Sequence, residues 1–307
     1  MNVLAYLTEQ SRLVDQALDL YTDPHRVEGR PEAPNLSEVP PLLLESMRYS
    51  LMAGGKRLRP VLLIASAGLF GAPPERVMPA ACALEMIHTY SLIHDDLPCM
   101  DDDDLRRGRP TNHKVYGEGM ATLAGDALLT MAFELLGRQM HVPGVTPVQA
   151  ARAVTEVAMA AGAGGMVGGQ VEDLAWEGKQ ASPEQLQRIH RLKTGALFRA
   201  SLRAGAILAG AAEQALVQLD RYALHFGLAF QIWDDVLDVI GDAAKTGKGV
   251  GRDAKHEKST YVSHFGLEGA KERARTEAAA ACAALEPFGP EAAFLTELAR
   301  FVVDREG

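Results

Sequence analysis

Apolar residues recur at helical spacing along almost the whole chain. Residues 2–22 carry Leu4, Leu7, Val14 and Leu18 on one face, with polar residues between them. The longest apolar stripe covers residues 212–240 and comprises Leu216, Leu219, Tyr222, Ala223, Phe226, Phe230, Trp233, Leu237 and Ile240. Alternation with a period of two, which would indicate strands, is nearly absent. The pattern therefore predicts an all-α protein of about ten helices.

Proline and glycine mark the expected ends of these helices. A proline-rich stretch at 31–41 separates the first helix from the next, and Ser182 followed by Pro183 is typical of a helix start. Residues 241–259 are rich in Gly and Lys and predict a loop, before a final helical region at 266–304. Because no change in composition divides the chain, we expect residues 1–307 to form a single domain.

The composition and charge describe a globular protein that repels polyanions overall. Of the 307 residues 47% are apolar, which argues against a disordered chain, and the formal net charge is −9. An anionic ligand would therefore need clustered Arg and Lys or a bound cation. The three cysteines lack metal-ligand spacing, the N-terminus lacks signal-peptide features, and no apolar run is long enough for a membrane helix. We expect a cytoplasmic protein without a membrane span or a nucleic-acid partner.

Two acidic motifs stand out, each near the end of an apolar helical segment. The first motif, residues 95–104, holds six carboxylates, and Tyr90, Leu92 and Ile93 are apolar almost up to its first aspartate. The second motif is residues 234–238, with Asp234 and Asp238 on one helical face. A solvated acidic loop could explain one such motif. Because crowded carboxylates need a cation and Mg²⁺ prefers oxygen ligands, two motifs favour a shared metal–diphosphate site between facing helices.

Basic residues accompany these motifs. The basic loop, residues 54–60 (GGKRLRP), places three cations at a predicted helix start, where backbone N–H groups and the helix dipole favour phosphate. Arg106 and Arg107 directly follow the first motif. Helical spacing also puts certain polar residues on shared faces: His88, Ser91 and Asp95 on one, Gln231, Asp234 and Asp238 on another, and Gln170 and Asp173 on a third.

Taken together, these motifs resemble those of the trans-prenyl diphosphate synthases, in particular the bacterial farnesyl diphosphate synthase group and the related geranylgeranyl enzymes. The resemblance rests on the basic loop, DDLPCMDDDDLRRGRPT from residue 95, GGQVEDL from residue 168, Lys193-Thr194-Gly195, FQIWDDVLD from residue 230 and GKGVGRD from residue 247. It covers nearly the whole chain, with the motifs in family order. The resemblance implies an isoprenoid-synthase-type helical bundle around a central cavity, and a homodimer.

The resemblance also implies a role for each matching residue. About three Mg²⁺ ions per active site are expected, with Mn²⁺ as a possible substitute. Direct metal ligands would be Asp95, Asp101 and Asp234, supported by Asp96, Asp235 and Asp238. The allylic diphosphate would be bound by Arg106, Gln170, Asp173, Lys193, Lys248 and Lys258. Isopentenyl diphosphate would be bound by Lys56, Arg59, His88 and Arg107. The reacting allylic cation would be flanked by Lys193, Thr194 and Gln231.

The implied reaction joins dimethylallyl or geranyl diphosphate to isopentenyl diphosphate by ionisation, condensation and elimination. In this family, bulk just before the first motif forms a cavity floor that limits chain length, which here falls on Tyr90 and Ser91. A tyrosine at this position resembles the enzymes that stop at fifteen carbons, so farnesyl diphosphate is the expected product and geranylgeranyl diphosphate the alternative. The family's C-terminal tails are often more basic than this one, in which Arg305 is the one cation near the end.

Other classes of protein explain the sequence less completely. A terpene cyclase would share the first motif but usually replaces the second with an Asn/Ser/Glu triad, and it needs no isopentenyl site. A silent regulatory subunit tends to lose one acidic motif, whereas both are intact here. A purely structural helical bundle would not explain acidic motifs near the ends of two apolar helices with cations beside them.

Overall fold

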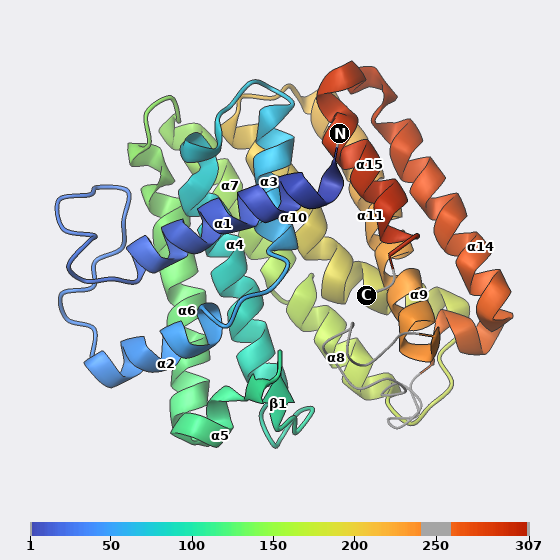
Figure 1. The fold of residues 1–307 in the computed structure, drawn as a ribbon, viewed down its shortest axis with the longest axis horizontal. Coiled ribbons are helices and arrows are strands. Elements are labelled where there is room, and N and C mark those ends of the chain that lie inside the picture. The colour runs from blue at the N-terminus through green and yellow to red at the C-terminus, as the bar shows by residue number, and fades with distance from the viewer. Residues whose placement is uncertain (1, 241–258, 306–307) are drawn as a thin grey trace. The chain divides into compact units, whose positions relative to one another are not determined.

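The computed structural model describes residues 2–240 and 259–305, and helices dominate this part of the chain (Figure 1). The α-helices are α1 (Val3–Tyr21), α2 (Pro41–Leu51), α3 (Leu58–Gly68), α4 (Pro74–Asp95), α5 (Asn112–Tyr116), α6 (Glu118–Arg138), α7 (Pro147–Ala161), α8 (Met166–Trp176), α9 (Pro183–His190), α10 (Ala196–Leu208), α11 (Glu213–Ile240), α14 (Tyr261–Ala284) and α15 (Ala293–Val302). Two 3₁₀ segments, η1 (Gln139–His141) and η3 (Glu286–Ala292), and one π-helix, η2 (Arg191–Gly195), complete the helical elements.

The all-α prediction is confirmed, with one small exception. Two short strands, β1 (Leu105–Arg106) and β2 (Arg109–Pro110), pair antiparallel directly after the first motif. The turn between them has positive φ at Arg107 (54°) and Gly108 (73°), the conformation that matches the twist of a tight hairpin. Strands of two residues are too short to produce an alternating sequence pattern, which is why the sequence did not indicate them.

The chain divides into two compact units. Unit 1 comprises residues 1–3, 156–203 and 211–307, and unit 2 comprises residues 4–155 and 204–210. Unit 2 contains α1 to α6, the basic loop and the first motif, while unit 1 contains α8, α9, η2, α11, α14, α15 and the second motif. The expectation of a single domain over residues 1–307 stays a prediction.

In unit 2, α4 packs against α3 and α6 and forms the centre of the core. Helix α3 is buried on nearly every side from Pro60 to Ala67, as expected for a helix that is apolar all round. The segment Glu118–His141 is long and apolar enough to cross a membrane by length and composition, and 44% of its most apolar window is buried in the structure. Because α6 packs on α4, this segment resembles a core helix of a globular protein, and the absence of a membrane span stays a prediction.

In unit 1, α11 runs along α14 (Figure 1). Buried aromatic side chains contribute to the core of this unit. Phe198 packs edge-on against Phe226 and Phe230, and the Tyr222 hydroxyl donates to the Leu295 carbonyl at 2.9 Å, which ties α11 to α15. The apolar stripe predicted from residues 212–240 therefore faces the core of this unit, except at its end, where Ile240 is 49% exposed because α11 finishes there.

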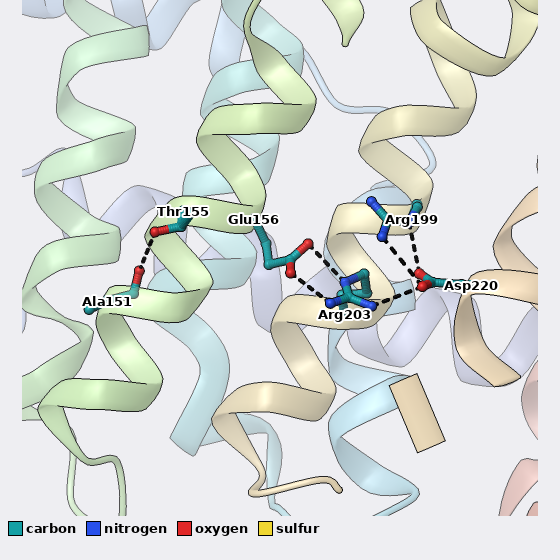
Figure 2. A network of polar contacts seen from close by, with 6 residues as sticks. All are labelled: Ala151, Thr155, Glu156, Arg199, Arg203 and Asp220. Carbon is teal, nitrogen blue, oxygen red and sulfur yellow. Dashed lines mark hydrogen bonds and ion pairs between the residues drawn. The ribbon is translucent and has the colours of Figure 1, made fainter. Parts of the chain in front are cut away.

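A chain of alternating charges joins three helices at the surface of unit 1 (Figure 2). Arg203 on α10 donates to both Glu156 oxygens at 2.7 and 2.8 Å, and also reaches Asp220 on α11 at 2.9 Å. Arg199 then pairs with Asp220 at 2.7 Å. Isolated surface ion pairs contribute about 0–1 kcal/mol each, but a bidentate network of this kind holds the three helices in register.

Candidate active site

The first motif begins where α4 ends. Asp95 is the last residue of α4 and Asp96 is its C-cap. The chain then folds back, because the Asp101 N–H donates to the Asp95 carbonyl at 2.8 Å. Asp95 and Asp101 are half-buried and Asp102 and Asp104 are exposed, so most carboxylates of this motif remain accessible from solvent.

Asp96 has a different environment from its neighbours. It is buried, and Arg106 on β1 donates its Nε to both Asp96 oxygens at 2.7 and 2.9 Å. Burial raises the pKa of Asp96, and Arg106 opposes that change by stabilising the carboxylate. The β-hairpin thus returns Arg106 to the motif it follows, and Asp96 fixes where this arginine points.

The basic loop is held by a buried ion cluster that the sequence analysis missed. The Arg57 side chain is fully buried at the N-cap of α3, where its backbone has a φ of 45°. Its guanidinium donates to Glu85 at 2.6 Å, to Asp15 at 2.8 Å and to the Leu51 carbonyl at 2.8 Å. The detectable signal was Glu85, an acidic residue within the apolar run of α4. We name Arg57, Glu85 and Asp15 the Arg57 cluster.

Two further arginines lie close to the Arg57 cluster. Arg107 donates to the Gly54 carbonyl, and its guanidinium carbon would be only 2.7 Å from a Cβ at Gly55, so a side chain there would displace the Arg107 guanidinium. The pKa of Arg59 is lowered to about 10, mainly by burial and in part by the nearby Arg107, while Glu85 opposes the change. Desolvation also lowers the pKa of the half-buried Arg107, and Arg57 and Arg106 add to this effect while Glu85 opposes it. Such crowding of cations in a partly desolvated place favours binding of an anion.

Helix α4 contributes the remaining predicted residues of unit 2. His88 is half-buried, and its carbonyl accepts a hydrogen bond from Ser91 Oγ at 2.9 Å. Tyr90 is buried, with 6% of its surface exposed, and meets the His94 ring edge-on at 5.6 Å between centroids. Tyr90 therefore lies on a buried face of α4, whereas Asp95 is half-exposed at its end.

The three aspartates of the second motif differ in their burial and in their hydrogen-bond partners. Asp235 is buried and accepts a hydrogen bond from the Tyr261 N–H at 2.7 Å, at the start of α14. Asp234 has a half-exposed side chain and accepts from Arg305 at 2.7 Å. Asp238 is half-buried one turn farther along α11. Asp235 therefore supports the fold locally, and Asp234 and Asp238 are the more accessible carboxylates.

The structure brings five of the predicted residues together around η2. Lys193 Nζ donates to Asp173 at 2.7 Å, and Thr194 Oγ1 donates to Gln231 Oε1 at 3.2 Å. Gln170 Nε2 is out of contact with solvent and has no hydrogen-bond partner among the described residues. A π-helical turn such as η2 is a frequent feature of functional sites. The predicted Lys248 and Lys258 lie outside the described residues.

Known proteins of one family resemble this chain over most of its length. The family described as Polyprenyl synthetase matches residues 40–286. A farnesyl diphosphate synthase of Geobacillus stearothermophilus is 45% identical over 306 residues, covering 100% of this chain and 99% of the relative. This chain belongs to the polyprenyl synthetase family.

Other members of the polyprenyl synthetase family are equally similar. A geranylgeranyl diphosphate synthase of Cyanophora paradoxa is 45% identical over 306 residues, covering 99% of this chain and 97% of the relative. The apo crystal structure of an FPP/GFPP synthase from Zymomonas mobilis superimposes with a TM-score of 0.83 at 39% identity, covering 97% of this chain and 99% of that one. The predicted family, the isoprenoid-synthase fold and the prenyltransferase class are thereby confirmed.

The carboxylates suit the Mg²⁺ on which this family generally depends. Among the described residues, no three His, Cys, Asp or Glu side chains form a group that could hold a metal ion by themselves. Mg²⁺, however, typically uses one or two carboxylates together with substrate phosphates and water. Asp95, Asp101, Asp234 and Asp238 are accessible hard-oxygen donors of this kind. Each unit therefore contributes carboxylates that suit a metal arriving with a diphosphate.

Gly169 of the GGQVEDL motif packs closely against the backbone of η2. Replacing it with alanine is expected to impair catalysis. A Cβ at Gly169 would lie 2.3 Å from the Lys193 backbone nitrogen, so α8 and η2 would have to separate. Because a shift of about 1 Å in a positioned group can cost about 100-fold, kcat/KM should fall by about that factor. Gly164→Ala is the control, since a Cβ there has open space. Equal steady-state activity of the two variants would contradict this packing role.

His190, directly before η2, should make the free energy of unfolding depend on pH. Its Nδ1 is removed from solvent, and burial lowers its pKa from 6.5 to about 4, partly opposed by Asp173 and Asp234. Between these two values the unfolded chain binds more protons than the folded one, so stability falls as the pH falls through this window. The expected loss is up to about 3 kcal/mol, and none arises from this group above pH 6.5.

Urea denaturation at about pH 7.5 and about pH 5 tests this prediction. His190→Gln should remove this part of the pH dependence, while the wild type should retain it. If both proteins lose the same stability between the two values, His190 is not the responsible group.

Proposed function

We propose that this prenyltransferase condenses an allylic diphosphate, dimethylallyl or geranyl, with isopentenyl diphosphate and releases farnesyl diphosphate as its main product. The observation that carries the proposal is the presence of accessible aspartates together with cations that other aspartates hold in place. Arg106 is held by Asp96 beside Asp95 and Asp101, and Lys193 is held by Asp173. Carboxylates that bind a cation next to oriented arginine and lysine suit a diphosphate leaving group.

Each part of the reaction has candidate residues. We propose Asp95, Asp101 and Asp234 as metal ligands, with about three Mg²⁺ ions as in the resembling enzymes. When bound, the metal would neutralise charge on the allylic diphosphate and stabilise it as a leaving group. Arg106 and Lys193 would donate to the same diphosphate, and the buried Gln170 amide offers a further donor.

The proposed reaction has three steps. The allylic C–O bond breaks with its electron pair leaving on diphosphate, and the oxygen dipoles of Thr194 and Gln231 flank the cation. The double bond of isopentenyl diphosphate, held by Lys56, Arg59, His88 and Arg107, then forms the new C–C bond. A proton leaves the resulting cation, and the released diphosphate is the proposed acceptor. Arg107 and Arg59 are preorganised for isopentenyl diphosphate, because the Arg57 cluster holds the basic loop and Arg107 is bonded to Gly54 within it.

Product length is the finer part of the proposal. Relatives named farnesyl and geranylgeranyl diphosphate synthases are each 45% identical to this chain, so overall similarity does not discriminate between the two products. Tyr90 favours fifteen carbons because its ring is buried on α4 five residues before Asp95. Geranylgeranyl diphosphate is the second candidate, supported by the Cyanophora relative.

Tyr90→Ala is expected to lengthen the product. Removing the buried ring leaves space on α4, so chains of twenty or more carbons should appear beside or in place of farnesyl diphosphate. Tyr90→Phe keeps the ring and should keep the wild-type product. Products are sized by chromatography after dephosphorylation, and an unchanged distribution for Tyr90→Ala would remove Tyr90 from the chain-length floor.

The decisive experiment for the proposed function is product analysis of the purified wild type. The protein receives labelled isopentenyl diphosphate, one allylic primer at a time and Mg²⁺, with parallel samples containing EDTA. A metal-dependent fifteen-carbon product supports the proposal, and a twenty-carbon product supports the second candidate. No elongation with any primer would refute the synthase assignment.

We also propose that the protein is a cytoplasmic homodimer. Large apolar side chains are exposed on three helices: Leu123 on α6, Val148 and Met159 on α7, and Val171 on α8. A second copy of the chain would bury such side chains in an interface. Light scattering coupled to size-exclusion chromatography measures the mass directly, and a value near 33.0 kDa would indicate a monomer.

A further inference from the structure

The segment after α15 is held against α11 through Arg305. The Arg305 side chain is only 6% exposed. Its Nη2 donates to Asp234 Oδ1 at 2.7 Å, its guanidinium lies 4.3 Å above the Phe230 ring centroid, and its carbonyl accepts from Trp233 Nε1 at 3.0 Å. Three neighbouring positions of α11 therefore hold this one residue.

The pair between Arg305 and Asp234 is asymmetric. The arginine is buried, but the Asp234 side chain remains 48% exposed. The hydrogen bond uses Oδ1 and thus limits rotation of the carboxylate, while Oδ2 takes no part in it. A carboxylate fixed through one oxygen presents the other in a defined direction, as second-shell partners do for metal ligands.

We infer that Arg305 is a positioning residue for the second motif, which orients the Asp234 carboxylate so that its Oδ2 can hold the metal–diphosphate. This inference rests on the proposed function. It gives the C-terminal arginine a role through Asp234, distinct from closing over isopentenyl diphosphate. It also gives the second motif an arginine–aspartate pair comparable to Arg106 and Asp96 in the first.

Two other interpretations of the contact between Arg305 and Asp234 predict a different effect on metal binding when the arginine is replaced. If Arg305 merely occupied the place of the metal, removing its charge would strengthen metal binding. If it only fastened the chain end, removing its charge would lower stability without changing metal affinity. Of the three interpretations, only a positioning role predicts that a variant without the Arg305 charge binds metal more weakly while its C-terminal segment stays docked. The direction of the change in Mg²⁺ affinity therefore separates the three readings.

The experiment compares Arg305→Gln with Arg300→Gln in the full-length chain. Arg300 is a matched control because it is exposed and pairs with Glu297 on its own helix. Mg²⁺ is titrated in the presence of inorganic pyrophosphate, and binding is followed by calorimetry and by the rise in Tm. Arg305→Gln should weaken Mg²⁺ binding by about 10- to 100-fold, and Arg300→Gln should match the wild type.

Trp233 reports whether the segment stays docked, because its indole N–H bonds the Arg305 carbonyl. In a Trp176→Phe background, the emission of Trp233 should be the same in Arg305→Gln and in its parent. If Arg305→Gln undocks, Arg305→Lys keeps the charge but loses the planar donor geometry, and it should still weaken Mg²⁺ binding. Unchanged or tighter binding in the docked variant overturns the inference.

Failure of the inference and failure of the proposed function are distinguishable. Wild-type product formation tests the function without reference to Arg305. A protein that elongates primers but shows equal Mg²⁺ affinity in both variants keeps the function and loses the inference. A wild type that neither elongates primers nor binds Mg²⁺ with pyrophosphate loses both.

Discussion

Replacing Glu85 with alanine should lower the free energy of unfolding by about 3–5 kcal/mol. The reason is that Arg57 would be left buried without its main counter-ion: both side chains of the pair are at most 2% exposed, and their atoms approach to 2.6 Å. Removing one partner of such a pair leaves an uncompensated charge in a poorly hydrated place. Urea denaturation at neutral pH measures the loss.

Asp15 provides the matched control for this prediction. It accepts from the same guanidinium at 2.8 Å, but its side chain is 43% exposed. Water can replace it, so Asp15→Asn should cost less than about 1 kcal/mol. The double variant Arg57→Met/Glu85→Leu should recover much of the loss, because it leaves no buried charge. A Glu85→Ala protein as stable as Asp15→Asn would show that this pair does not hold the basic loop.

Asp95→Asn should lower kcat by about 100- to 1000-fold at a fixed Mg²⁺ concentration. Asp95 is the accessible carboxylate at the end of α4, and Asp101 is folded against it by a backbone hydrogen bond. An amide keeps the shape but loses the charge that would hold a cation beside the leaving diphosphate. Steady-state rates with geranyl and isopentenyl diphosphate, measured over a range of Mg²⁺ concentrations, test this.

Asp104→Asn is the control from within the same motif. Asp104 is exposed, and its carboxylate pairs with Lys114 at 2.7 Å. It has no part in the metal binding proposed for Asp95. Its substitution should leave kcat within about threefold of the wild type. If Asp95→Asn retained full activity while Asp104→Asn lost it, the assignment of metal ligands within the first motif would have to be reversed.

Much about this protein could be predicted from its sequence, because the relevant signals are local. The spacing of apolar residues predicted the helices, and most of the predicted apolar stripe, from Leu216 to Leu237, lies on the buried side of α11. Ser182 was expected to begin a helix, and it caps α9 through a hydrogen bond from the Gln185 N–H. The acidic and basic motifs identified the family because residue type and order along the chain are enough to recognise them.

Tertiary structure alone decided how those motif residues are used. Asp234 and Asp235 are neighbours with the same chemistry, yet one meets Arg305 and the other the start of α14. In the sequence Arg57 is one of three similar cations in the basic loop, and only the structure shows that Glu85 and Asp15 both bind it. These partners are 26 to 71 residues apart in the chain. Their pairing depends on how helices pack, and periodicity along one helix carries no information about which distant side chain will face it.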